Sequence, residues 1–70
     1  SEAEEHLKRA EKLRPNDPLV LAGWGEFYAA TGNMPQAVTK YREAITLAPN
    51  ELVYKHQLAI ALTKSGDISG

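Results

Sequence analysis

Residues 18–51 read PLVLAGWGEFYAATGNMPQAVTKYREAITLAPNE, and this stretch decides the fold. It holds two segments with apolar residues at helical spacing, separated by a turn-forming Thr-Gly-Asn triplet at 31–33. Asp17 is placed to cap the first segment, and Pro18 occupies its first turn, where a missing N–H costs nothing. Asn33 is placed to cap the second segment. Because a short turn between two helices makes them antiparallel, the stretch predicts a helical hairpin.

The same pattern extends outward, because Pro15-Asn16, Pro49-Asn50 and Ser65-Gly66-Asp67 mark further turns. Ser1 and Glu4 are spaced as a capping box for a preceding helix, and Asn50 is placed to cap a following one. No segment alternates with period two, so we expect no strand. The predicted fold is all-α, with antiparallel helical hairpins stacked on each other. Its four helices are expected at about residues 1–14, 18–31, 34–48 and 51–65.

The sequence also repeats itself. A shift of 34 residues, the distance from Pro15 to Pro49, aligns residues that have the same structural role in each copy. The alanines allow helices to approach closely, the prolines end a helix, and the glycines end a helix where a left-handed backbone is needed. The aligned pairs are Ala3 with Ala37, Ala10 with Ala44, Leu13 with Leu47, Pro15 with Pro49, Asn16 with Asn50, and Gly32 with Gly66.

A known repeat pattern fits this register. The motif W-x2-L-G-x2-Y, A-x3-F and P corresponds here to Leu21-x2-Trp24-Gly25-x2-Tyr28, Ala37-x3-Tyr41 and Pro49. The chain therefore resembles the tetratricopeptide repeat family, although the first two apolar types are exchanged and tyrosine replaces phenylalanine. The resemblance implies a fragment of a right-handed solenoid. It divides the chain into the second helix of one repeat at 1–17, a complete repeat at 18–51, and the first helix and turn of another at 52–70.

A glycine inside a helix costs about 1 kcal/mol relative to alanine, so Gly25 is expected where two helix backbones approach closely. Ala37 and Ala44 would supply hollows into which Trp24 and Tyr28 pack. The residues predicted to pack the repeats together are Leu7, Ala10, Leu21, Trp24, Gly25, Tyr28, Ala37, Tyr41, Ala44, Leu58 and Leu62.

Composition excludes several classes of function. The 70 residues carry eight basic and nine acidic side chains, a net charge of −1, and no cysteine. Thiolate metal sites and disulfides are therefore excluded, and the balanced charge argues against a nucleic-acid partner. The longest apolar run is far shorter than the roughly 20 residues of a membrane span. No cofactor motif is present, and nothing indicates a cellular compartment.

No catalytic constellation is recognisable. The serines and aspartates fall mostly at helix caps and ends, outside any nucleophile motif. His6 and His56 lie on different predicted helices, and neither has a second ligand at i+3 or i+4. We therefore expect neither an enzyme nor a metal site.

In the family that the chain resembles, the first helix of each unit lines a concave groove that receives a peptide or helix from a partner protein. Members that clamp a terminal carboxylate use lysine, arginine and asparagine there. This chain has Ala22 and Glu26 at such positions, and Glu26 would repel an anion. We expect a shallow apolar groove suited to an extended apolar peptide or an amphipathic helix. Its residues would be Leu19, Ala22, Gly23, Glu26, Ala30, Val53, His56, Gln57, Ile60 and Lys64.

Some of these groove residues have an alternative interpretation. Leu19, Val53 and Ile60 can instead serve only to pack adjacent units. Gly23 can mark a close approach from the groove side, or it can be tolerated drift without a function.

The way the chain divides into repeats gives a second functional hypothesis. It would begin with the second helix of one repeat and stop after the first helix of another, so each end would leave an apolar face without a neighbouring helix. Association with further copies into a homo-oligomer would cover these faces. The residues to be covered would be Leu7, Leu13, Leu58 and Leu62.

Overall fold

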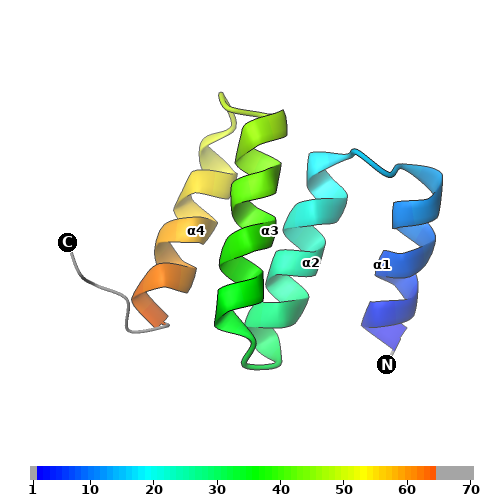
Figure 1. Ribbon diagram of the computed structural model, residues 1–70, viewed down its shortest axis with the longest axis horizontal. Helices are drawn as coiled ribbons and strands as arrows, with labels where there is room; N and C mark the ends of the chain where they lie inside the picture. The colour runs from blue at the N-terminus through cyan, green and yellow to red at the C-terminus, as the bar shows by residue number, and fades with distance from the viewer. Residues whose placement is uncertain (1, 65–70) are drawn as a thin grey trace.

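The computed structural model describes residues 2–64, which form four α-helices and, within that range, no strand. The helices run antiparallel and lie side by side in chain order (Figure 1). The molecule measures 37 × 29 × 14 Å. Its smallest dimension is about half of the next one, so the four helices form a flat array. The bounds are α1 Glu2–Leu13, α2 Pro18–Ala30, α3 Met34–Leu47 and α4 Leu52–Lys64.

The start and end of α2 follow the predicted turn chemistry. The Asp17 side chain accepts a hydrogen bond from the backbone N–H of Leu19 at 2.9 Å, and Pro18 occupies the first turn. After the helix, Gly32 has φ of 87°, the left-handed conformation that glycine adopts without strain. The N–H of Asn33 then donates to the carbonyl of Tyr28 at 2.7 Å, which closes the turn.

Of two further predicted caps, Asn33 is confirmed in position only and Asn50 is wrong. Asn33 stands at the N-cap of α3 but makes no side-chain hydrogen bond to the helix, and its amide instead donates to the Thr31 hydroxyl at 3.4 Å. Asn50 lies in the turn, because α4 begins only at Leu52 and the N–H of Glu51 donates to the carbonyl of Ala48. The proposed Ser1 cap and the turn at 65–67 lie outside the described residues.

The core lies between α2, α3 and α4. Ala37 and Ala44 have no exposed surface, and Tyr41, between them on the same face of α3, is 4% exposed. Small alanines let the neighbouring helices approach, and the tyrosine ring fills the remaining space. Other members of the buried cluster are Ala22, Tyr54 and Ala61, with Leu21, Tyr28 and Leu58 packed at its edge.

Gly25 lies at a close contact, as predicted, but the contact is made by a side chain and not by a second helix backbone. A Cβ atom added there would lie 2.6 Å from Cε1 of Tyr41, so the glycine admits the tyrosine ring of α3. The prediction that Trp24 packs into the hollows of Ala37 and Ala44 is wrong. Trp24 is buried outside that cluster, and its ring stacks on Tyr28 with centroids 5.6 Å apart.

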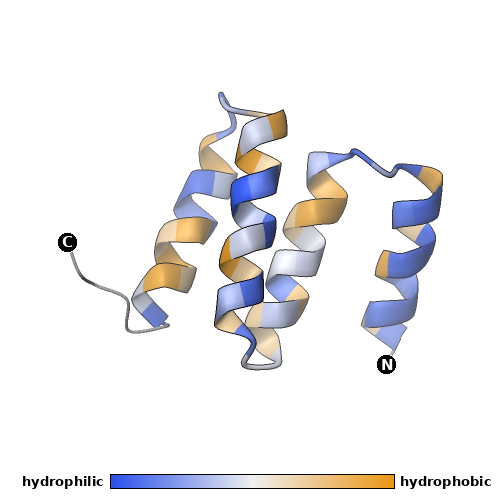
Figure 2. Cartoon of the chain, in the orientation of Figure 1, coloured by the Kyte–Doolittle hydropathy of each residue, from blue (hydrophilic) through white to orange (hydrophobic). Residues whose placement is uncertain are grey.

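The first helix is attached less closely than the others. No residue of α1 is buried, and Leu13 at its end is 82% exposed. Leu7 and Ala10 are half-buried, as are Leu58 and Leu62 of α4. Figure 2 shows α1 as almost entirely hydrophilic, with small apolar patches, whereas α2 is mostly neutral to hydrophobic. The apolar area available to hold α1 is correspondingly small.

Candidate functional site

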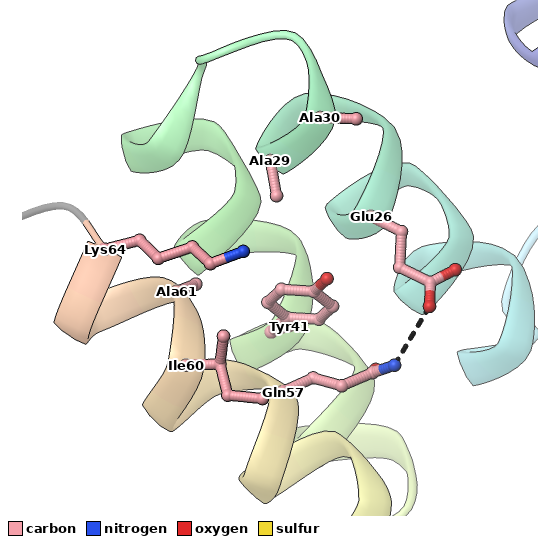
Figure 3. A pocket seen from close by; sticks show the side chains of 8 residues that line it. All are labelled: Glu26, Ala29, Ala30, Tyr41, Gln57, Ile60, Ala61 and Lys64. Atoms are coloured by element: carbon pink, nitrogen blue, oxygen red, sulfur yellow. Dashed lines mark hydrogen bonds between the residues drawn. The ribbon is translucent and has the colours of Figure 1, made fainter.

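A pocket of about 340 Å³ lies between α2 and α4 and contains more of the predicted groove residues than the other hollows of the described residues (Figure 3). Both helices present one face to it, since the lining residues of α4 follow the helical spacing i, i+3, i+4 and i+7 from Gln57. Tyr41 of α3 lies between these two walls. The lining residues are Glu26, Ala29 and Ala30 of α2, Tyr41 of α3, and Gln57, Ile60, Ala61 and Lys64 of α4.

A hydrogen bond joins the two walls. Nε2 of Gln57 donates to Oε1 of Glu26 at 3.0 Å, between residues 31 positions apart in the chain. The other end of this amide is unsatisfied, because Oε1 of Gln57 is buried and accepts no hydrogen bond from the described residues. An unsatisfied buried polar atom costs about 1–3 kcal/mol. The Gln57 side chain is therefore fixed at one end and poorly stabilised at the other.

The Tyr41 side chain forms the centre of the pocket. Its ring packs on Gly25, and its hydroxyl points between the two walls (Figure 3). Burial raises the pKa of the Tyr41 hydroxyl above its usual value of 10.0, and the Glu26 carboxylate raises it further. The hydroxyl is thus protonated at neutral pH and can both donate and accept a hydrogen bond.

Lys64 supplies a charge at the opposite end of the pocket from Glu26. Its ammonium group extends over Ala61 toward the Tyr41 ring (Figure 3). Both ion pairs found among residues 2–64 lie elsewhere, one between Arg14 and Asp17 and one between Lys40 and Glu43. The pocket is therefore small and largely apolar at its centre, with a carboxylate at one end and an ammonium at the other.

Half of the predicted groove residues meet in this pocket, namely Glu26, Ala30, Gln57, Ile60 and Lys64. The other half do not line it. Ala22 is 6% exposed and belongs to the core, so its prediction as a groove residue is wrong. Gly23 faces α1, since an added Cβ would lie 2.7 Å from Cδ2 of Leu7.

Three further predicted groove residues are exposed outside the pocket. Leu19 borders a crevice between α1 and α2, together with Leu7, Ala10 and Leu13. His56 lines a shallow depression on α4 next to Ile60 and Lys64. Val53 is exposed near the start of α4 and lines neither hollow.

Sequence reasoning assigned no pocket role to Ala29, Tyr41 and Ala61. The two alanines carry a detectable signal, because they lie at i+3 from Glu26 and i+4 from Gln57 and so share a helix face with them. Tyr41 was assigned only to packing, and its hydroxyl end reaches the pocket because Gly25 gives its ring room. The buried residues Val20 and Tyr54 were also missed, although their 34-residue separation fits the repeat.

The described residues contain neither a metal-binding cluster nor a membrane-spanning helix. Among the described residues, no group of three histidine, cysteine, aspartate or glutamate side chains is placed to hold a metal ion. None of the helices in that range is long and apolar enough to cross a membrane. Comparison of the chain with protein-family models, with curated proteins and with solved structures finds no match.

Proposed function

We propose that this chain is a non-catalytic protein-interaction module of the tetratricopeptide type, which holds a peptide or helix of a partner protein between α2 and α4. The observation that carries the proposal is the correspondence of the two pocket walls. Glu26 and Ala30 of α2 correspond to Ile60 and Lys64 of α4 at the 34-residue shift. Equivalent faces of two repeat units thus meet at one concavity, as expected for the first helices of successive units.

The packing supports the same interpretation. Gly25, Ala37 and Ala44 stand at the small positions of the repeat motif, and each is buried between helices. Sequential packing is typical of a repeat array, since each helix contacts mainly its neighbours in the chain. On this basis the four helices form one complete repeat flanked by two partial ones.

The dimensions of the pocket favour a narrow occupant. Ala29, Ala30 and Ala61 leave room for the backbone or a small side chain of a peptide. Ile60 is 41% exposed and offers an apolar surface at the rim. A segment that binds here would be extended or would present one apolar face of a helix.

The test starts from peptides selected on the immobilised chain from a displayed random library. A selected peptide is then titrated against Ala30→Arg and Ile60→Glu, which place charged side chains in the pocket. Each variant should weaken binding at least about tenfold, because a charge buried against an apolar ligand is left without a partner. Thr39→Arg, at an exposed site of α3 outside the pocket, is the matched control and should change little. Equal binding to all four proteins would remove the pocket from the mechanism.

Self-association is the second candidate, and the exposed apolar residues favour it. Leu13, Leu19 and Leu52 are 82%, 67% and 72% exposed, and all three lie at or next to the end of a helix. Exposed apolar surface of this kind often marks a contact between proteins. Light scattering should then give a mass above that of one chain, with a decrease on Leu13→Glu or Leu52→Glu. A constant monomer mass at high concentration would contradict this function.

A further inference from the structure

The two ends of the pocket differ in charge, and this difference constrains what can bind. Glu26 lies on the α2 wall and Lys64 lies near the end of α4, with the Tyr41 ring between them (Figure 3). Because the chain has a net charge of only −1, no strong overall field competes with these local charges.

The Glu26 carboxylate forms no ion pair with any residue that the structure describes. Glu26 is exposed, and neither of the ion pairs within residues 2–64 involves it. Its side-chain partner is the neutral amide of Gln57, which occupies one carboxylate oxygen. A carboxylate accepts several hydrogen bonds and forms its strongest ones with cationic donors.

The Gln57 amide adds a second acceptor beside the first. Its NH2 group is held by Glu26, while its carbonyl oxygen is buried and accepts nothing from the described residues. A cation that donates to Glu26 replaces the Gln57 NH2 group there and leaves the amide free to rotate. The rotated amide then offers its oxygen to the same cation, so both acceptors are satisfied together.

We propose that the pocket selects a peptide segment that carries a lysine or arginine, with the cationic side chain bound by Glu26 and Gln57. This inference rests on the proposed function, since it names the chemistry of the segment that the groove holds. The residue beside the cation is small or apolar, because it lies over Tyr41 and the alanines of both walls. An acidic side chain at the same position is disfavoured by repulsion from Glu26.

The experiment uses three pools of blocked decapeptides that differ at one central position, which is lysine, norleucine or glutamate. All other positions are randomised over uncharged residues. Norleucine keeps the aliphatic stem of lysine without its charge, so the comparison isolates the cation. Retention of each pool is measured on immobilised wild-type chain and on Glu26→Gln. Glu5→Gln, an exposed site on α1, is the control for the loss of one negative charge.

Wild-type chain should retain the lysine pool about threefold to fivefold over the norleucine pool, and the glutamate pool least, as expected for an exposed charge pair. The preference should disappear in Glu26→Gln, persist in Glu5→Gln, and weaken in about 0.5 M salt. Equal retention of the lysine and norleucine pools, or a preference unchanged in Glu26→Gln, would overturn the inference.

Retention of the uncharged norleucine pool on Ile60→Glu separates this inference from the proposed function on which it rests, because the added carboxylate cannot attract that pool. Loss of this retention, with no preference among the pools on the wild-type chain, would overturn the cation inference alone. Norleucine-pool retention that is unchanged in Ile60→Glu, or no retention of any pool on the wild-type chain, would overturn the proposed function and the inference with it.

Discussion

Two contacts in the molecule involve residues that correspond at the 34-residue shift but are packed very differently. One contact is between α1 and α2, and the other is among α2, α3 and α4. Ala10 and Ala44 are equivalent at the 34-residue shift, yet Ala44 has no exposed surface and Ala10 is half-buried. Among the described residues, α3 packs closely on a helix at each side, whereas α1 packs mainly on α2, and this accounts for the difference. In a linear array, burial is therefore determined by the number of neighbouring helices as much as by the residue itself.

Replacing the central tyrosine should have the largest effect. Tyr41→Ala removes the ring that fills the space between α2, α3 and α4, and a buried aromatic replaced by alanine typically costs about 3–5 kcal/mol. A domain of this size has little stability in reserve, so this variant should be mostly unfolded at 37 °C. Circular dichroism with urea denaturation measures the loss.

The comparison variant is Leu7→Ala on α1. Leu7 is half-buried and has partners on one side, so its loss should cost only about 1 kcal/mol and leave the other three helices folded. Amide hydrogen exchange should show faster exchange in α1 than in α3 even in the wild-type chain. Equal costs for the two substitutions would mean that α1 is held as firmly as the core.

Enlarging the equivalent alanines should have the next largest effect. Ala44→Leu inserts three heavy atoms where no space exists, which should cost about 1–3 kcal/mol through overpacking. Ala10→Leu makes the same change beside an open crevice and should be neutral or slightly stabilising. Thermal unfolding of the pair measures the contrast directly, and a similar loss in both would contradict the difference in packing.

Much of the fold could be predicted because turn chemistry and helical spacing are local properties. The Asp17 cap, the glycine turn at Gly32 and the four helices all depend on residues within a few positions of each other. The cap predicted at Asn50 failed because proline and asparagine fit a turn as well as a helix start. The structure places the turn first and starts the helix at Leu52.

The site was predicted only in part, since α2 packs on both α1 and α3 and also lines the pocket. Successive helix residues are rotated by about 100°, so Ala22, Gly23 and Gly25 face different neighbours. Ala22 joins the core, Gly23 faces Leu7, and Gly25 faces Tyr41. The apolar pattern shows that such a helix is buried but not which helix lies against which face. The bond between Gln57 and Glu26 depends on the relative placement of two helices and leaves no local signal.

The two glycines of α2 give the smallest contrast. A methyl group at Gly25 would meet three atoms of the rigid Tyr41 ring at 2.6 to 2.8 Å, whereas one at Gly23 would meet only the end of the flexible Leu7 side chain. Gly23→Ala should therefore raise the free energy of unfolding by most of the roughly 1 kcal/mol by which alanine stabilises a helix relative to glycine. Gly25→Ala should lose more by overpacking than it gains, with a net cost of about 1 kcal/mol. Urea denaturation shows whether each variant is more or less stable than the wild-type chain. Gly23→Ala should leave peptide retention unchanged, because that residue faces α1. A destabilised Gly23→Ala would show that Leu7 is held rigidly, and α1 would then have to be counted with the core.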